Sequence, residues 1–482
     1  MIQMQRRGFW PARFLCGVLL LIPLWFSACG KEGTEPRPDV LLITIDTLRA
    51  DWIHAYGFGA ETTPRIDALA ARGVLFEKAI AAASLTAPSH ASIMTSRYAR
   101  EHSIGTLNGE TRLAGGETLA ERFQKSGYET AAFVSNVVLR RRSGLDRGFE
   151  TYDDELVTSE INREAYFERI AERTAERALA WLSSRTSDQP IFLWLHLQDP
   201  HGPYTPPEEY QGQLGDWPLR LTRPLPVLDQ NIGVAGIPAY QALGDARLPA
   251  VYAGRYGEEL LYADYWVGEV VERFEDQAGE RGGIVLLTAD HGESMGEFGW
   301  YFQHGHATTP DLVQVPFLIV APNIQPKRID SLVSHVDVAP TLLDLAGLEP
   351  LPESSGLSLG SVILEGKSLA PRLVFSDTEG ETAVYTTDRL TRLTGPMLGR
   401  PSGSASPPQI QTLQWGGEGP WRQMARDAAD AQALLQYVEN SAPLVAADAM
   451  LPEHIDQLRA LGYLPPEVEV ESKDSVVPPS DP

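Results

Sequence analysis

The sequence predicts an α/β fold in which a mostly parallel sheet is flanked by helices, followed by a smaller α+β part at the C-terminal end. Continuous apolar runs at 39–44, 190–197 and 283–288 are typical of strands that are buried on both faces of a sheet. Helix-like segments separate these runs, and this alternation of strands and helices is typical of parallel sheets.

The N-terminal segment, residues 1–28, is expected to be a signal peptide. A basic start precedes an apolar run at 14–26 that is too short for a comfortable permanent membrane span. The small residues before Cys29 resemble the lipobox of bacterial lipoproteins. We therefore expect cleavage before Cys29, lipidation of that residue, and export as a membrane-anchored lipoprotein of the cell envelope. An ordinary signal peptide and an uncleaved anchor are the alternatives.

The rest of the chain divides by composition. Residues 29–38 form a polar tether, 39–350 the main domain, 351–465 a C-terminal subdomain and 466–482 an acidic, proline-bearing tail that is expected to be disordered. The net charge of −24 excludes nucleic acid as a partner, because phosphate backbones require a basic surface.

The elements of the main domain follow in order after the first strand. The segment 203–249 is rich in proline and glycine and is read as a long excursion that could act as a substrate lid. The other expected elements are helices at 62–73, 116–127, 159–184, 257–277 and 337–345, and strands at 129–135 and 316–321. In the C-terminal subdomain we expect strands at 372–376, 382–386 and 409–415, and helices at 421–439 and 452–461.

The stretch 84–97, SLTAPSHASIMTSR, carries a candidate nucleophile. Pro88 suits the first turn of a helix, so Thr86 lies where free N–H groups and the positive end of the helix dipole meet an anion. A hydroxyl at that place can attack a phosphate or sulfate ester. The alternative is a threonine that only caps the helix.

Residues that can bind a metal ion fall at corresponding ends of the predicted strands, which is where ligands bind in open α/β sheets. Oxygen ligands and imidazole together suit a divalent ion, which would lower the pKa of a nearby hydroxyl. Each of the candidate ligands alone could be a turn or loop residue. We expect His54, His90 and His335 to have structural roles only, and Asp337 to be a helix N-cap. The residues of this set are Asp46, Thr86, His201, Asp290, His291 and His304.

The motifs together resemble the sulfatase family of the alkaline phosphatase superfamily. They include DVLLITIDTLRADWIHAYG, SLTAPSHASIMTSR, LHLQDPHGPY, LLTADHGESMGEFG and FQHGHATTPDLVQVPFLIVAP, and cover roughly 39–349. The resemblance implies an alkaline-phosphatase-like fold. It implies that Asp46, Asp290 and His291 are metal ligands, and that Thr86 holds the nucleophile position and touches the metal. His201 and His304 fall where the family binds the sulfate or phosphate group and assists the leaving group; His306 is the adjacent candidate for substrate binding.

The chain departs from that family at the nucleophile. Sulfatases carry a cysteine or serine that is converted to formylglycine, whereas Thr86 cannot be converted, so no formylglycine is expected. His90 replaces the arginine of the motif, Ile45 stands beside Asp46 in the first ligand pair, and Ser135 with Asn136 replaces a lysine and histidine pair. A metal-activated threonine resembles instead the phosphodiesterases and phosphoethanolamine or phosphoglycerol transferases of the superfamily.

The sequence therefore predicts a metal-dependent hydrolase of an anionic sulfate or phosphate ester, with a covalent intermediate on Thr86. Zinc or manganese is favoured as the metal, with calcium and magnesium as alternatives. A transferase that decorates envelope glycans or lipids, and a catalytically silent binding lipoprotein, are the alternative functions. The substrate and the oligomeric state are left open.

Overall fold

The computed structural model describes residues 37–104, 112–113, 115–214, 223–378, 380–394, 409–415 and 422–441. The predicted signal peptide, Cys29, most of the tether, the predicted helix at 452–461 and the tail lie outside the described residues. Within the described ranges, no helix is both long and apolar enough to cross a membrane.

The central sheet is mixed but mostly parallel, as predicted. Its strands lie in the order β11-β2-β12-β8-β1-β7-β3-β4, and β13 pairs with β2. The parallel run contains β8 (Gly283–Ala289), β1 (Asp39–Ile45), β7 (Ile191–Leu197), β3 (Glu129–Phe133) and β4 (Thr151–Asp153). Beside it, β12 (Phe317–Val320) is antiparallel to β8, and the last strands are β2 (Val74–Ile80), β11 (Gln314–Val315) and β13 (Lys327–Ser334).

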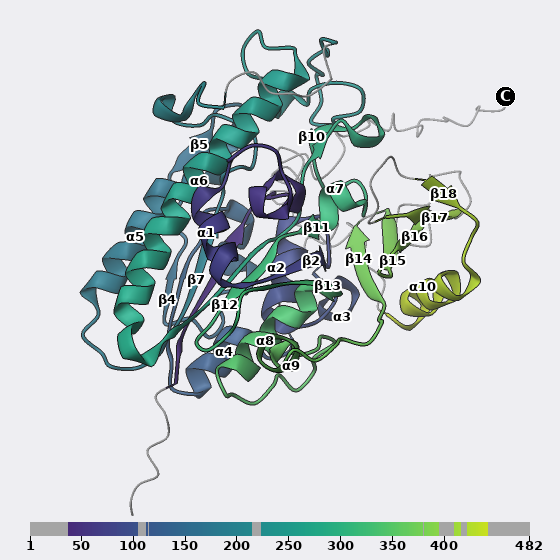
Figure 1. Ribbon diagram of the computed structural model, residues 1–482. Coiled ribbons are helices and arrows are strands. Elements are labelled where there is room, and N and C mark those ends of the chain that lie inside the picture. The colour runs from purple at the N-terminus through teal and green to yellow at the C-terminus, as the bar shows by residue number, and fades with distance from the viewer. Residues whose placement is uncertain are drawn as a thin grey trace, which may run out of the picture. The chain divides into compact units, whose positions relative to one another are not determined.

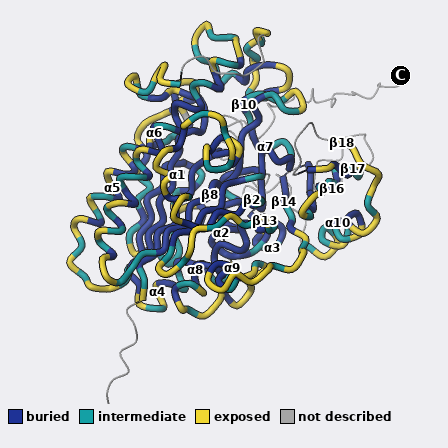
Figure 2. Tube along the Cα trace, in the orientation of Figure 1, coloured by how far each residue is buried: buried dark blue, intermediate teal, exposed yellow. Residues whose placement is uncertain are grey.

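The register of the three middle strands sets the position of the site. Ile45 at the end of β1 pairs with Leu197 of β7 and with Ala289 of β8. The next residue of each strand therefore emerges at the same edge of the sheet. The side chains of β1 and β7 are buried throughout, and Figure 2 shows the sheet as the buried centre of the structure.

Two groups of helices flank the sheet (Figure 1). One group is α1 (Pro64–Arg72), α5 (Ala171–Ser184) and α6 (Pro249–Ala278). The other contains α2 (Thr86–Thr95), α3 (Ala99–His102), α4 (Leu119–Lys125), α8 (Val338–Leu345) and α9 (Gly360–Glu365). Near the site lie β9 (Ser294–Met295), β10 (Tyr301–Gln303) and α7 (Pro310–Val313).

The predicted helix at 159–184 is wrong over its first half. The chain instead forms an antiparallel hairpin of β5 (Thr158–Glu160) and β6 (Arg163–Glu168) before α5 begins. Tertiary contacts override helix propensity here, because Arg163 and Tyr166 are drawn into a buried aromatic cluster. Helix α6 also begins earlier than predicted, at Pro249, which suits the first turn of a helix.

The C-terminal part of the chain contains a second, antiparallel sheet in the order β14-β15-β16-β17-β18. The strands are β14 (Val374–Thr378), β15 (Glu381–Tyr385), β16 (Arg389–Thr394), β17 (Gln409–Gln414) and β18 (Arg422–Met424). Helix α10 (Ala428–Asn440) packs on β15 and β16, so the predicted helix at 421–439 is wrong at its start, where β18 lies. The strand β16 was not predicted.

Candidate active site

Three of the predicted metal ligands come together at the carboxyl edge of the sheet. Asp46 follows β1, and Asp290 with His291 follows β8. One ligand atom from each of the three lies within 4.8 Å of the others, and all three side chains are buried. His291 Nε2 is 3.4 Å from Asp290 Oδ2 and 3.8 Å from Asp46 Oδ1.

The hydrogen bonds around these residues leave the inward atoms available. Asn136 Nδ2 donates to Asp46 Oδ2 at 2.8 Å, and the backbone N–H groups of Thr47 and His291 donate to Asp290 Oδ1. His291 Nδ1 lies 3.0 Å from the carbonyl oxygen of Gly292, so Nδ1 carries the proton and Nε2 presents a lone pair.

Two carboxylate atoms at the centre are buried without a hydrogen-bond partner among the described residues. They are Asp46 Oδ1 and Asp290 Oδ2. Burial raises the pKa of Asp46 to about 6, although the charge of His291 and the Asn136 hydrogen bond lower it. Unpaired buried carboxylate oxygens are costly, and two of them beside an imidazole lone pair fit a divalent cation.

Thr86 is the first residue of α2 and lies against this group. Its Oγ1 is 3.3 Å from His291 Nε2, and its side chain is buried. Leu85, the residue before the helix, offers no side-chain cap, so no side chain at that position satisfies the amino-terminal N–H groups of α2. Ser89 fixes the helix start, since its Oγ is 2.7 Å from the carbonyl oxygen of Asp290.

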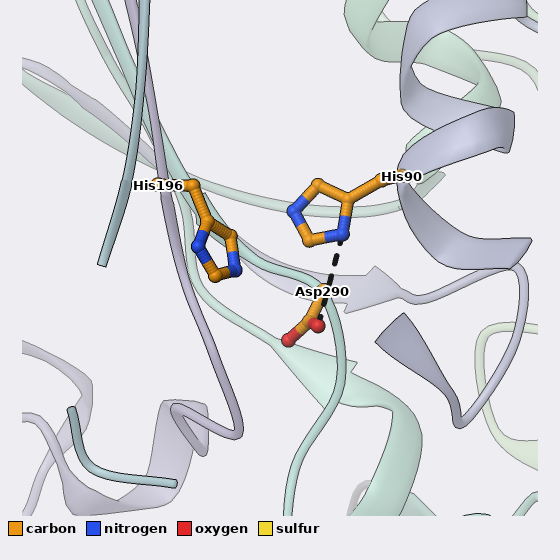
Figure 3. A group of neighbouring side chains, drawn as sticks. All are labelled: His90, His196 and Asp290. Atoms are coloured by element: carbon orange, nitrogen blue, oxygen red, sulfur yellow. Dashed lines mark ion pairs between the residues drawn. The ribbon is translucent and has the colours of Figure 1, made fainter. Parts of the chain in front are cut away.

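His90 and His196 flank Asp290, as Figure 3 shows, and form a second group of potential metal ligands with it. His90 uses both ring nitrogens: Nδ1 donates to the Thr86 carbonyl at 2.8 Å, and Nε2 accepts from Thr44 Oγ1 at 3.0 Å. Burial lowers the pKa of His90 to about 3, so the ring is neutral. His90 therefore supports the start of α2, which agrees with the expectation that it is structural.

His196 was missed in the sequence, although it is the only polar residue in the apolar run of β7. Its Nε2 is 3.6 Å from Asp46 Oδ2 and has no hydrogen-bond partner among the described residues. Burial lowers its pKa to about 4. It is a neutral imidazole at the inner wall of the site.

His201 and His304 lie on the other side of the proposed ligands. The ring centroids of His304 and His291 are 4.4 Å apart, and those of His304 and His201 are 5.2 Å apart. Glu293 Oε1 is 3.3 Å from His304 Nδ1, and burial raises the pKa of Glu293 to about 8. Burial lowers the pKa of His304 to about 4 and that of His201 well below its usual range.

The hairpin β5–β6 contacts His201, and sequence reasoning gave it no role. The ring of Tyr166 stacks on His201 with an interplanar angle of 4°. The guanidinium of Arg163 makes a bidentate ion pair with Glu160 and lies between the rings of Tyr166 and Tyr240. Glu160 in turn lies 3.7 Å from His201 Nδ1.

His306 is directed elsewhere. Its ring stacks on Trp300 with centroids 3.8 Å apart, and its Nε2 is 3.5 Å from Ser294 Oγ. The structure thus brings Asp46, Thr86, Asp290, His291, His201 and His304 into one site, whereas contact of His306 with substrate stays a prediction.

Comparisons with known proteins identify the family and the fold. The family model described as Sulfatase matches residues 38–348. The uncharacterized sulfatase YidJ of Escherichia coli is 25% identical over 355 residues, covering 65% of this chain and 68% of that protein. The Δ4,5-hexuronate-2-O-sulfatase of Bacteroides thetaiotaomicron is 28% identical over 367 residues, which cover 70% of this chain and 74% of that protein. The phosphonate monoester hydrolase from Silicibacter pomeroyi has a similar fold, with a TM-score of 0.62 at 19% identity and coverage of 84% and 94%.

Proposed function

The chain belongs to the sulfatase family and is a sulfatase-type hydrolase, and we propose that it cleaves sulfate or phosphate esters by direct attack of the Thr86 hydroxyl. The position of Thr86 Oγ1 carries this proposal. It lies at the amino end of α2, 3.3 Å from His291 Nε2, beside two carboxylates that each leave one buried oxygen without a partner in the described chain.

The ligand set proposed for the divalent ion is Asp46, Asp290, His291 and Thr86. When bound, the ion would supply Lewis acidity that lowers the pKa of the hydroxyl and neutralises charge on the substrate oxygens. Zinc or manganese suits carboxylate and imidazole ligands better than calcium does, because calcium prefers oxygen ligands alone.

Thr86, His304 and Glu293 have different roles in the proposed cleavage of the ester. Thr86 releases its hydroxyl proton to solvent before the attack, and Oγ1 then forms a bond to the phosphorus or sulfur atom as the bond to the leaving oxygen breaks. The leaving oxygen needs a proton, and the neutral ring of His304 can donate one from Nε2 if Nδ1 accepts from Glu293. The raised pKa of Glu293 keeps this carboxyl protonated at neutral pH, as that role requires.

The second step returns the enzyme to its starting state. A water molecule attacks the phosphorus or sulfur atom, the bond to Thr86 Oγ1 breaks, and the proton of the water returns to the His304–Glu293 pair. His201, on which the ring of Tyr166 stacks, would hold the transferred group. The amino end of α2 adds N–H donors for its oxygens.

The test uses protein that lacks residues 1–28 and compares an aryl sulfate, a phosphate monoester and a phosphate diester, with and without added zinc or manganese. Thr86→Ser keeps a hydroxyl, whereas Thr86→Val keeps the shape and removes the nucleophile. We expect the valine variant to lose at least about a thousandfold in kcat, which corresponds to about 4 kcal/mol, with little change in melting temperature. Valine activity within tenfold of the parent would exclude Thr86 as the nucleophile.

We also propose that lipidated Cys29 holds the enzyme at the cell envelope. The basic start, the short apolar run and the small residues before Cys29 support this. Full-length protein should fractionate with membranes and incorporate labelled fatty acid, and Cys29→Ser should abolish the incorporation. Equal labelling of both proteins would exclude Cys29 as the lipid site.

A further inference from the structure

The segment that carries His304, residues 301–309, consists of β10 and the loop that leads from it to α7, and other parts of the chain hold it from two sides. On one side is the excursion 203–249. Tyr240 Oη and Gln241 Nε2 both donate to the carbonyl oxygen of Phe302, at 3.1 Å each. The excursion was predicted to act as a lid. Through these two hydrogen bonds its described part also supports the loop.

On the other side the C-terminal sheet holds the same loop through three buried side chains. Thr378 Oγ1 donates to the carbonyl oxygen of Gly305 at 2.5 Å, one residue after His304. Glu381 Oε1 accepts from the N–H and the hydroxyl of Thr308, at 2.8 and 2.6 Å. Tyr385 Oη donates to the Thr308 carbonyl at 2.5 Å.

Gly305 fixes the loop against the nucleophile as well. Its φ is +80°, which favours glycine, and a Cβ added there would lie 2.7 Å from Leu85 Cδ2. Leu85 directly precedes Thr86. The loop is therefore enclosed between the residue before the nucleophile and the C-terminal sheet.

The C-terminal sheet is itself fixed to the segment that leads into α2. The N–H of Asp377 donates to the carbonyl oxygen of Ala82 at 3.0 Å, and Asp377 forms a bridge with Ala83. The carboxylate of Asp377 pairs with Arg100 at 2.8 Å, with both side chains 1% exposed. One sheet thus contacts both the approach to Thr86 and the loop of His304.

We propose that the C-terminal sheet, chiefly through Thr378, is a positioning element that holds His304 opposite Thr86. The catalytic part of this inference rests on the proposed function, whereas the orientation of His304 is measurable without turnover. Thr378 touches no reacting group and acts only through the Gly305 carbonyl. Removing its hydroxyl would free that carbonyl and let the His304 ring depart from its geometry, to which catalytic rates are sensitive.

The experiment compares Thr378→Val, which removes the hydroxyl, with Thr378→Ser, which keeps it. Thr391→Val is the matched control, because Thr391 is buried in the same sheet and its Oγ1 lies 3.0 Å from Thr412 Oγ1 rather than against the loop. We expect Thr378→Val to lower kcat about 10- to 100-fold with less than a threefold change in KM. Thr378→Ser and Thr391→Val should stay within threefold of the parent.

A second readout is the NMR signal of the His304 ring in protein labelled at histidine, of which the chain has ten, assigned with His304→Gln. The signal should shift or broaden in Thr378→Val alone among the three variants. If it does so while the parent cleaves no ester, the positioning stands and the proposed reaction fails. If the kcat and the His304 signal of Thr378→Val match those of Thr391→Val, the sheet contributes packing only. Should Thr378→Val not fold, Tyr385→Phe removes the neighbouring bond to Thr308 and is read in the same way.

Discussion

Asn136 offers a direct test of how the chain prepares Asp46 to hold a cation. Its Nδ2 donates to Asp46 Oδ2 at 2.8 Å, and its Oδ1 accepts from the N–H of Val138 at 3.0 Å, so one side chain makes two separable contacts. Asn136→Ser can keep the contact with Val138, because serine is a good cap, but it is too short to reach Asp46. Asn136→Ala loses both contacts.

The size of the expected loss of metal affinity follows from the fact that Asn136 donates to a buried carboxylate, that of Asp46. A hydrogen bond to a charged group contributes about 1.5–3 kcal/mol, and changing a group that orients a metal ligand lowers metal affinity about 10- to 100-fold. Both variants should therefore bind zinc or manganese about 10- to 100-fold more weakly than the parent. Only the alanine variant should lose a further ~1 kcal/mol of folding stability through the missing cap.

The loss of metal affinity in the Asn136 variants should depend on pH in a definite direction. The hydrogen bond from Asn136 lowers the pKa of Asp46, which burial has raised to about 6. Without that donor the pKa rises further, and protons compete with the metal to a higher pH. The loss of affinity should therefore be larger at pH 6 than at pH 8.

Calorimetric titration of metal into apoprotein at both pH values measures these quantities, and urea unfolding of the same samples measures stability. The reasoning would be refuted if both variants bound metal within threefold of the parent at pH 6. A deficit in alanine but not in serine would assign the effect to the Val138 contact instead.

Two further predictions concern the folded state. A chelator should lower the melting temperature, because Asp46 Oδ1 and Asp290 Oδ2 then lose their counter-charge; metal at a thousandfold its Kd should restore about 4 kcal/mol, and an unchanged melting temperature would contradict the ligand set. Burial lowers the pKa of His102 to about 3. Below pH 6.5 the unfolded chain therefore binds a proton that the folded chain does not. As the pH is lowered, the free energy of unfolding decreases by at most about 1.4 kcal/mol per pH unit for this residue. His102→Gln should reduce that slope in urea unfolding between pH 6.5 and 5, and an unchanged slope would show that His102 is protonated in the folded protein.

The parts of the site that could be predicted from sequence are those fixed by the ends of buried parallel strands. Asp46 and Asp290 each follow an apolar run, and the in-register pairing of β1 with β8 brings them together without information from elsewhere in the chain. Thr86 was predicted in the same way, because Pro88 marks the start of a helix. Local pattern and the geometry common to such sheets indicated where these residues lie, whereas the roles of metal ligand and nucleophile came from the resemblance to the sulfatase family.

The residues that were missed act through contacts between distant segments. Arg163 and Glu160 are three residues apart, a spacing that is equally natural in a helix, and only the rings of Tyr166 and Tyr240 show why a hairpin forms. Glu293 stood in a quoted motif without a role, because its partner His304 is brought near by the turn of the loop. The contacts of Thr378 with the His304 loop have no local signal at all.

The proposed covalent intermediate on Thr86 gives these missed residues a common role. Thr86 has a single hydroxyl, so a covalent intermediate on it can be released only by a second attack at the phosphorus or sulfur atom, and the group that gives a proton in the first step must take one in the second. Because burial lowers the pKa of His304 to about 4, its ring is neutral at pH 7, and a lone neutral ring is a weak acid for the first step. Glu293, with its raised pKa, compensates if it shares the proton with His304, but only while the two side chains stay within hydrogen-bond reach. On the proposed mechanism, the reaction at Thr86 depends on the loop that carries His304, which is contacted by the excursion and by the C-terminal sheet.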